Sequence, residues 1–323
     1  MPTNTIKLIA DIGGTNARFA IANQNQPGFS HERSMDGSQF AGIDQAIQRY
    51  LELESVGQPT SMCLAIAGPV IDQQAQLTNS PWVVSAQDLS RQLGGCPVKL
   101  INDFTAVALS LAALGPADLQ PIGTDACAVQ LPEENYTVGV LGPGTGLGIA
   151  GLLRREDALI PLPSEAGHMG FAPETRKQSE LLQALHERWP RVSIERLVSG
   201  QGLENTYWAL NHLERGDAPS LTAAEIFEKA INQQDQQCLT AVDLFFEMLG
   251  QVAGDVALAY GAEQGIYIAG GIVKRYPGML HASTFRKAFE NKGRHKVFLE
   301  RIPTNLITHP QPGLLGAACC PVD

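Results

Sequence analysis

The sequence predicts an α/β protein of two similar lobes, in which helices pack on mixed β-sheets. Three observations support this prediction. The chain has 323 residues, which is the usual length of two domains. Apolar strand-like segments alternate with amphipathic helical segments, as they do in α/β folds. A glycine-rich turn between two apolar strand-like segments occurs once in each half of the chain.

The first half begins with a strand, a glycine turn and a strand, and then alternates. The strand after the first helix is ended by Gly68 and Pro69. Ser85 precedes an apolar-periodic segment and is the expected N-cap of a helix. The expected elements are helix 40–53, strand 62–67, strand 82–84, helix 85–93, strand 98–101 and helix 102–114.

The second half begins with a similar strand, turn and strand over residues 137–153, and is then rich in helices. A proline and a glycine between residues 109 and 121 mark the expected crossing between the lobes. The further elements expected are helices 175–187, 194–213, 222–232 and 235–263, strand 267–269 with a helix after it, strand 304–307 and helix 313–319.

Composition and charge exclude several classes of function. The net charge is −10, from 23 Lys and Arg against 33 Asp and Glu, and no basic run of five residues occurs, so neither nucleic acid nor a membrane surface is an expected partner. We expect no signal peptide and no membrane span, and therefore a cytoplasmic protein. The six cysteines show no C-x-x-C spacing, so reduced, mostly buried thiols are expected and a zinc site is not.

The two glycine turns are the most informative motifs. They are Asp11–Asn16 (DIGGTN) and Gly142–Gly146 (GPGTG). A backbone that lies against phosphate oxygens needs glycine, because a Cβ would block the approach. Each turn alone could be an ordinary hairpin, and the second is neither a Walker A motif nor a Rossmann motif. Together they favour one nucleotide held between two similar lobes.

Asp11 ends an apolar strand just before the first turn. Its carboxylate could hold Mg²⁺, directly or through water, beside phosphates bound by the N–H groups of Gly13 and Gly14 and the hydroxyl of Thr15. Gly270 and Gly271 form a third glycine site, between a strand and a helix. This third site is either a contact for the nucleoside or a close junction between strand and helix.

Asp103 is the candidate catalytic residue. It follows a buried strand and begins a helix, which places its carboxylate at a sheet edge where open α/β sites form. An Asp at a helix start is often only an N-cap, although Asn102 could fill that role.

Glu165 and His168 lie three residues apart in a loop bounded by proline and glycine. They could bond sugar hydroxyls, bind a metal as a pair, or belong to a plain surface loop. Glu195 alone would be an ordinary acid of a helical first turn. Residues 78–82, which include Asn79, would by themselves be a turn.

The motifs in their order resemble those of bacterial glucokinases of the ATP-dependent type, within the hexokinase–actin–Hsp70 superfamily. The resemblance extends from Lys7 to Ala318. Ala166 and Pro143 depart from the family pattern, and Pro143 removes one N–H donor from the second turn. The cysteine-rich zinc motif of the repressor/open-reading-frame/kinase group is absent. The matching segments are DIGGTNAR (11–18), LTNSPW (77–82), INDFTA (101–106), GPGTGLG (142–148), PSEAGH (163–168), SGQGL (199–203), IAGGIV (268–273) and PGLLG (312–316).

This resemblance implies a two-lobed hexokinase/actin-like (ribonuclease H-like) fold, with a cleft that closes when sugar binds. It implies a small domain of residues 1–112 plus 304–323 and a large domain of residues 113–303. The implied reaction transfers the γ-phosphoryl group of ATP to the 6-hydroxyl of glucose, at the entry to glycolysis, with Mg²⁺. A homodimer is common among such proteins.

The resemblance also implies roles for individual residues. Asp103 matches the catalytic base, and Asp11 is the expected Mg²⁺ contact, through water. The sugar-binding candidates are Asn102, Asp103, Glu165, His168, Glu195 and Asn79. The ATP-binding candidates are Ala10, Asp11, Ile12, Gly13, Gly14 and Thr15 in the first turn, Gly142, Gly144, Thr145 and Gly146 in the second, and Gly270 and Gly271 for the adenosine.

Three alternatives stay open at this stage. A kinase of the same fold could act on mannose, fructose or an N-acetylhexosamine, or use polyphosphate in place of ATP. A sugar-responsive regulator would need a DNA-binding segment ahead of residue 7, for which we expect no room. An actin-like filament protein would not explain Glu165 and His168 together with Asp103.

Overall fold

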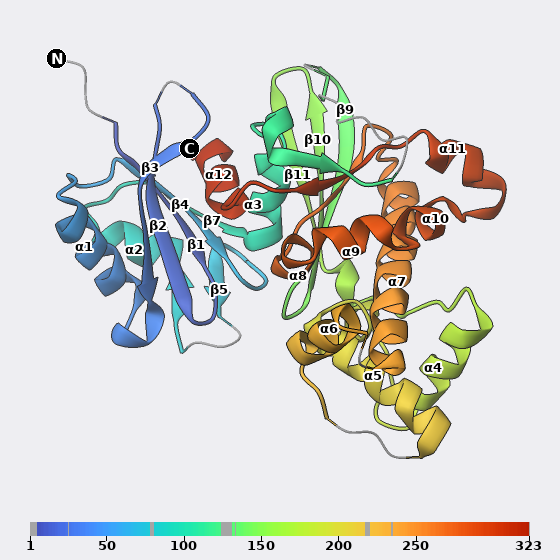
Figure 1. Ribbon diagram of the computed structural model, residues 1–323. Coiled ribbons are helices and arrows are strands. Elements are labelled where there is room, and N and C mark those ends of the chain that lie inside the picture. Colours follow the sequence, from blue (N-terminus) through green and yellow to red (C-terminus); the bar gives the residue numbers. More distant parts are fainter. Residues whose placement is uncertain are drawn as a thin grey trace. The chain divides into compact units, whose positions relative to one another are not determined.

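The computed structural model (Figure 1) describes residues 5–24, 26–77, 81–123, 131–132, 134–216, 220–233 and 235–322. The chain forms two compact units. The first comprises Met1–Gly115, Leu159–Pro163 and His309–Asp323, and the second comprises Pro116–Ala158 and Ser164–Thr308. These limits differ from the expected limits at 112/113 and 303/304 mainly because the strand at residues 304–307 pairs within the second unit. Among the described residues, no helix is both long and apolar enough to cross a membrane.

The first unit contains a five-stranded sheet in the order β3-β2-β1-β4-β7. Strand β1 (Lys7–Ile12) is antiparallel to β2 (Asn16–Ala22) and parallel to β4 (Ser61–Ile66), and β4 is parallel to β7 (Val98–Asn102). Strand β3 (Phe29–Asp36) extends the antiparallel side. Strands β1, β4 and β7 therefore end at one edge of the sheet.

Helices and a small sheet pack with this five-stranded sheet in the first unit. The small sheet pairs β5 (Gln74–Gln76) with β6 (Val83–Ser85). Ser85 is the N-cap of α2, as predicted, and its hydroxyl accepts a hydrogen bond from the Asp88 N–H at 3.3 Å. The helices are α1 (Ile43–Glu54), α2 (Ala86–Gln92), α3 (Asp103–Ser110) and α12 (Pro312–Cys319).

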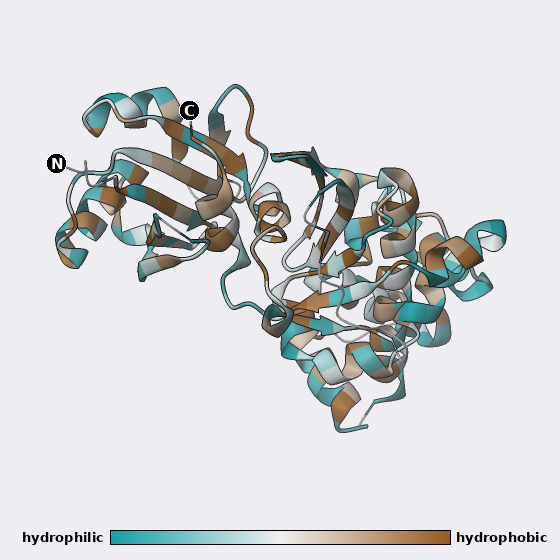
Figure 2. Cartoon of the chain, turned by 90° about the horizontal axis from the view of Figure 1, so that it is seen from above, coloured by the Kyte–Doolittle hydropathy of each residue, from teal (hydrophilic) through white to brown (hydrophobic). Residues whose placement is uncertain are grey.

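Helix α12 brings the end of the chain against α3 and β1 (Figure 1). A glycine permits this close packing, because a Cβ added to Gly316 would lie 1.6 Å from the carbonyl oxygen of Ala106 in α3. Hydrophobic residues lie along the strands near the N-terminus, and hydrophilic residues dominate the outer turns (Figure 2). The C-terminal helix is thus part of the core of the first unit.

The second unit is built on strands in the order β10-β9-β12-β13-β8. Strand β9 (Tyr136–Pro143) is antiparallel to β10 (Leu147–Arg155) and parallel to β12 (Ile266–Ile268), which is parallel to β13 (Thr304–Ile307). The order β10-β9-β12-β13 repeats the order β2-β1-β4-β7 of the first unit, with the same strand directions. Strand β8 (Leu119–Pro121) ends this order, and most of β11 (Ala158–Ser164) belongs to the segment 159–163 of the first unit.

Helices account for most of the second unit. Its core is centred on α7 (Gln236–Tyr260), whose Phe245 and Phe246 pack against Phe227, with ring centroids 6.3 and 6.2 Å away. The other helices are α4 (Arg176–His186), α5 (Gly200–Arg215), α6 (Ala223–Ile231), α8 (Gly271–Arg275), α9 (Pro277–Ala282), α10 (Phe285–Glu290) and α11 (Lys296–Glu300).

One expected helix was wrong. The segment 194–213 is not one helix but a 3₁₀ turn, η4 (Ile194–Arg196), followed by α5. The reason is Ser199, whose extended backbone interrupts the helix and whose hydroxyl accepts a hydrogen bond from the Gly202 N–H at 2.9 Å. This break places Glu195 in a separate 3₁₀ turn ahead of α5.

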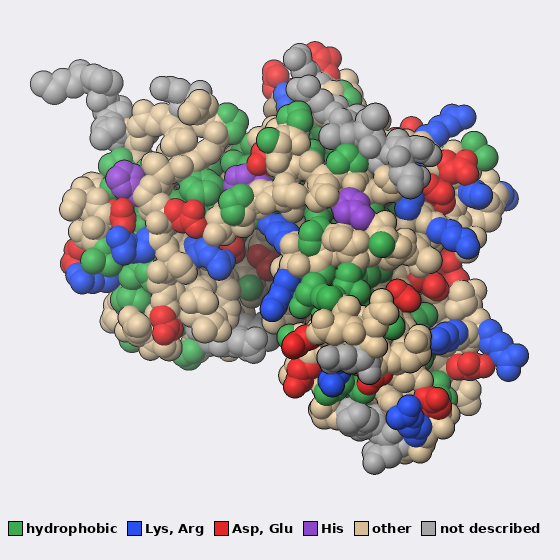
Figure 3. Space-filling view, in the orientation of Figure 1, with side chains coloured by type: hydrophobic (Ala, Val, Ile, Leu, Met, Phe, Trp, Pro, Cys, Tyr) green, Lys and Arg blue, Asp and Glu red, His purple; other side chains and the backbone are tan. Residues whose placement is uncertain are grey.

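Surface charge and cysteine burial agree with the composition. On the face shown in Figure 3, acidic and basic side chains are interspersed over both units. In the described part of the chain, Cys63, Cys96, Cys238 and Cys320 are buried and form no disulfide, as expected of structural cysteines. Cys127 lies outside the described residues.

Candidate active site

The first glycine turn connects β1 to β2 in the first unit. The Gly13 N–H donates a hydrogen bond to the Asn16 carbonyl oxygen at 3.0 Å, and the Gly37 N–H donates to the Thr15 carbonyl oxygen at 2.9 Å. Ala10 and Ile12 are buried in β1, whereas Gly13 and Gly14 are partly exposed and Thr15 is exposed. The turn therefore presents backbone and a hydroxyl at the carboxyl end of β1.

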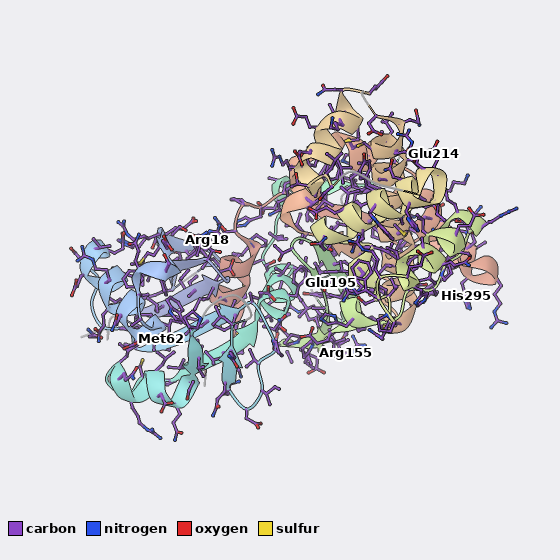
Figure 4. All side chains as sticks on the ribbon, turned by 90° about the horizontal axis from the view of Figure 1, so that it is seen from below. Arg18, Met62, Arg155, Glu195, Glu214 and His295 are labelled. Carbon is purple, nitrogen blue, oxygen red and sulfur yellow. The ribbon has the colours of Figure 1, made fainter. Side chains whose placement is uncertain are left out.

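Asp11 lies half-buried at this strand end. Burial raises the pKa of its carboxyl group, and the positive charge of Arg18 (labelled in Figure 4), 4.0 Å away, lowers it again in part. A Cβ added to Gly313, in the first turn of α12, would lie 2.9 Å from Asp11 Oδ2. The carboxylate is thus confined between β2 and α12. In the part of the chain that the structure describes, no three His, Cys, Asp or Glu side chains form a metal-binding group.

Asn102 and Asp103 lie at the same sheet edge as the first turn. The register of the parallel strands places Ile12 of β1 beside Ile66 of β4, and Ile66 beside Asn102 of β7. Since neighbouring strands are about 4.8 Å apart, the ends of β1 and β7 are roughly 10 Å apart. The predicted phosphate turn and the predicted catalytic carboxylate therefore share one edge of one sheet.

The N-cap of α3 is Asn102 and not Asp103. Asn102 Oδ1 accepts hydrogen bonds from the N–H groups of Phe104 and Thr105, at 2.9 and 3.2 Å, and its Nδ2 donates to the Gly68 carbonyl oxygen at 3.1 Å. Asp103 Oδ1 accepts a bond from the Phe104 N–H at 2.8 Å. The structural role that the sequence could have given to Asp103 is thus filled by its neighbour.

The second glycine turn and the third glycine site meet in the second unit. Strand β9 ends at Pro143, and the next parallel strand, β12, is followed by Gly270. Gly270 has a φ of +100°, and a Cβ there would lie 2.4 Å from the Pro143 carbonyl oxygen. Both observations require glycine. Gly271 then begins α8, so the predicted phosphate and adenosine sites are adjacent.

Glu165, His168 and Glu195 form one cluster, also in the second unit. His168 Nε2 is 4.0 Å from Glu165 Oε2, and His168 Nδ1 is 4.0 Å from Glu195 Oε1. Glu165 and His168 are more than 60% exposed, and Glu195 is 31% exposed. Figure 4 labels Glu195. Three polar side chains with both acceptor and donor atoms can bond several hydroxyl groups of one sugar.

A cavity of about 610 Å³ adjoins this cluster and is lined by Thr145, His168 and Glu195, among others. That volume is within the usual range of about 300–1,000 Å³ for small-molecule sites. Thr145 of the second glycine turn and two of the sugar-binding candidates, His168 and Glu195, therefore border the same cavity. Asn79, the remaining sugar-binding candidate, lies outside the described residues.

Arg191 is a site residue that sequence reasoning missed. Its guanidinium donates a hydrogen bond to the carbonyl oxygen of His168, and it lines the same cavity. The contact depends on a short ladder in which the Ile194 N–H donates to Met169 and the Phe171 N–H donates to Val192. No local motif marks a pairing of segments so far apart in the sequence.

The repeated sheet with a glycine turn in each unit, and carboxylates at the strand ends, defines a phosphotransferase of the actin-like ATPase fold. The family model described as Glucokinase matches residues 8–322, and the chain belongs to the glucokinase family. It is an enzyme, a glucose-phosphorylating sugar kinase.

Relatives match along nearly the whole chain. A glucokinase of Nitrobacter hamburgensis is 41% identical over 319 residues, covering 98% of each chain. A glucokinase of Caulobacter vibrioides is 41% identical over 316 residues, covering 96% of this chain and 93% of that one. The crystal structure of glucokinase from an Antarctic psychrotroph is 33% identical with a TM-score of 0.89, covering 98% of this chain and 99% of that one. The structure of Balamuthia mandrillaris glucokinase in complex with glucose shares the fold. It is 23% identical, with a TM-score of 0.78, and the match covers 97% of this chain and 92% of that one.

Proposed function

We propose that this enzyme transfers the γ-phosphoryl group of ATP to the 6-hydroxyl group of glucose, giving glucose 6-phosphate and ADP, with Asp103 as the general base. The observation that carries the proposal is that Asn102 caps α3, while the carboxylate of Asp103 stands beside it at the edge that also bears the first glycine turn. Since Asn102 is the cap of this helix, the Asp103 carboxylate, whose Oδ1 also accepts the Phe104 N–H, is proposed to serve the reaction.

In the proposed step, the Asp103 carboxylate accepts the proton of the sugar 6-hydroxyl as that oxygen attacks the γ-phosphorus. The bond between the γ-phosphorus and the bridging oxygen breaks, and ADP leaves with the electron pair. Phosphoryl transfer depends mainly on positioning and charge stabilisation, and a positioned base adds about 10²–10⁴-fold in rate. Asp103 therefore both orients the hydroxyl and receives its proton.

The sugar is proposed to bind Asn102, Asp103, Glu165, His168 and Glu195, and also Asn79. Hydrogen bonds of this kind create specificity, because an analogue that lacks a hydroxyl leaves a polar group of the site without a partner. The 4.0 Å spacings from His168 to Glu165 and to Glu195 support binding of neighbouring hydroxyls by this cluster.

ATP is proposed to bind the turns of residues 10–15 and 142–146 through its phosphates, and Gly270 and Gly271 through its adenosine. Thr15 and Thr145 are both exposed and supply hydroxyl donors. Pro143, which has no N–H, lies in β9 with its carbonyl against Gly270, so the missing donor is not at the tip of the second turn.

Mg²⁺ fits the residues at the first turn. Mg²⁺ is usually held by one or two carboxylates, waters and substrate phosphates, so a complete protein cage is not required. Asp11 is a half-buried carboxylate confined beside the turn, and we propose that it holds the ion through water. The ion would neutralise charge on the phosphates.

We also propose a cytoplasmic homodimer. The buried free thiols suit a reducing compartment, and dimers are common among proteins with this set of motifs. Sedimentation equilibrium of the purified chain measures its mass directly. A single species of monomer mass at micromolar concentration would contradict the dimer.

A sugar panel tests the proposed reaction. Glucose, mannose, fructose and N-acetylglucosamine are each supplied with ATP or with polyphosphate, and the phosphorylated sugar is quantified. We expect kcat/KM to be highest for glucose with ATP, and product NMR to place phosphate on O6. A higher value for another sugar or donor, or phosphate on another hydroxyl, would overturn the assignment. Light scattering in the same buffers detects filaments, which we do not expect.

A further inference from the structure

We propose that Glu195 is a positioning residue that joins the sugar-binding loop to the second glycine turn, so that bound sugar strengthens the binding of ATP. The inference rests on the proposed function and deepens it. It assigns two roles to one carboxylate. One oxygen faces the sugar-binding loop, and the other contacts the second glycine turn. The coupling it predicts concerns only residues of the second unit.

One oxygen of Glu195 holds the end of the turn. Glu195 Oε2 accepts a hydrogen bond from the Leu147 N–H at 2.9 Å, directly after the turn. A Cβ added to Gly146 would lie 2.4 Å from this same oxygen, so the carboxylate lies against the turn backbone. A hydrogen bond from a backbone N–H to a carboxylate is charge-assisted and about twice as strong as a neutral one.

The other oxygen of Glu195 faces the sugar-binding loop. Glu195 Oε1 is 4.0 Å from Nδ1 of His168. The loop itself also touches Leu147, because a Cβ added to Gly167 would lie 2.3 Å from the Leu147 carbonyl oxygen. Leu147 is thus contacted through its N–H by Glu195 and through its carbonyl by the loop that carries Glu165 and His168.

The backbone around Glu195 is tied to the turn as well. The Ser199 hydroxyl donates to the Glu195 carbonyl oxygen at 2.8 Å, and the Gly200 N–H donates to the Gly144 carbonyl oxygen at 2.8 Å. Movement of the Glu195 segment would therefore move the turn. A rigid connection of this kind is what coupling between two binding sites requires.

The hydrogen bonds within the second glycine turn determine which of its backbone N–H groups are available to bind phosphate. The Gly144 N–H donates to the Gly146 carbonyl oxygen at 2.8 Å, and the Leu147 N–H is held by Glu195. Over the described residues, the N–H groups of Thr145 and Gly146 make no hydrogen bond within the protein. These two N–H groups can donate to phosphate only while the glycine turn keeps its present conformation. The hydrogen bond from the Leu147 N–H to Glu195 maintains that conformation.

The sign of the coupling follows from this geometry. A sugar hydroxyl that donates to Glu195 Oε1 fixes the carboxylate and so keeps Oε2 on the Leu147 N–H. The turn is then already ordered when ATP arrives, and less binding free energy is lost in ordering it. We expect glucose to tighten nucleotide binding about fivefold or more, as is typical of coupled sites.

The test measures the coupling factor by isothermal titration calorimetry. The Kd of a non-hydrolysable ATP analogue with Mg²⁺ is determined with and without saturating glucose, for the wild type, Glu195→Gln and Glu165→Gln. Glu195→Gln removes the charge that holds Leu147, whereas Glu165→Gln changes a carboxylate of the same cluster that makes no hydrogen bond to the turn in the described structure. By reciprocity, the Kd of glucose must change by the same factor when the analogue is present.

We expect a coupling factor of about five or more in the wild type and Glu165→Gln, and close to one in Glu195→Gln. A merely structural role would weaken both ligands and leave the factor unchanged. Equal factors in all three proteins, or a factor of one in the wild type, would overturn the proposal. If Glu195→Gln does not fold, Glu195→Asp replaces it, since its shorter chain cannot keep both contacts. Wild-type glucose phosphorylation, assayed separately, shows whether the proposed function itself has failed.

Discussion

Glu165 and His168 are exposed side chains with few contacts inside the protein, so their substitution should affect the ligand more than the fold. Replacing either with Ala would remove the proposed hydrogen bonds to the sugar and leave the proposed ATP contacts in place. We expect KM for glucose to rise about tenfold or more, since a lost hydrogen bond to a charged group costs about 1.5–3 kcal/mol. KM for ATP should rise by less than threefold.

Steady-state kinetics with each substrate varied in turn measures both constants. Glu187→Ala is the matched control, because Glu187 is an exposed carboxylate paired with His212 outside the cluster. Equal increases in the two KM values, or none, would contradict the assignment of these residues to the sugar.

At the residue scale, the sequence indicated the glycine positions and Asp103, because backbone approach and strand ends have local patterns. Gly270 shows this, since its positive φ and its contact with Pro143 can be met only by glycine. Glu195 shows the limit. Its local sequence pattern is that of an acidic residue in the first turn of a helix, whereas its hydrogen-bond partner Leu147 is 48 positions away in the sequence. Only the folded chain reveals such a contact.

At the element scale, the paired strand–turn–strand units were predicted, since apolar runs and glycines mark them. Strand β3 was not, because six of the eight residues in FSHERSMD are polar or charged and only Met35 is buried, which leaves no apolar alternation to detect. The break before α5 was also not predicted. The helical periodicity continues through Ser199, so the sequence does not reveal that this serine caps a new helix.

Asp235 provides an element-scale prediction, because it caps the long helix α7. Its Oδ1 accepts hydrogen bonds from the N–H groups of Gln237 and Cys238 at 2.8 and 3.1 Å. Asp235→Ala should lower the free energy of unfolding by about 1 kcal/mol, as is usual for a lost N-cap. Urea denaturation at pH 7 measures the loss, and Asp235→Asn, which can still cap, should lose less.

The same cap predicts a pH dependence. Burial raises the pKa of Asp235, but hydrogen bonds from Cys238, Gln237 and Tyr207 outweigh burial and lower it overall. A group with a lowered folded pKa stabilises the protein above its unfolded value, about 3.9, and loses that effect as the pH falls through the folded value. The difference between wild type and Asp235→Ala should therefore be constant from pH 7 to about pH 5 and shrink below about pH 4. A difference that grows on acidification would contradict this.

At the scale of the whole molecule, the chain leaves the first unit after residue 115, returns to it over residues 159–163, and returns again at residue 309. The sequence did not fix these limits, since no linker or composition change marks them. Helix α12 completes the first unit through its contact with α3, where Gly316 lies against Ala106. The two ends of the chain are thus needed for one core.

Gly316→Ala should destabilise that core, because a methyl group placed 1.6 Å from a backbone oxygen forces α12 away from α3. Overpacking usually costs about 1–3 kcal/mol, and we expect a loss of at least that size in the first unit. Differential scanning calorimetry measures it. Gly278→Ala is the control, since nothing lies within 4 Å of an added Cβ there. Equal melting of the two variants would contradict the role of close packing.

The most direct test of the central claim is the turnover of Asp103→Asn, measured beside its affinity for glucose. The amide keeps the size and hydrogen-bonding ability of the side chain but cannot accept the proton. We predict that kcat falls about 10²–10⁴-fold while the Kd of glucose, from calorimetry, stays within a few-fold of the wild-type value. Turnover close to that of the wild type would contradict the assignment of Asp103 as the base, and with it the account of the reaction.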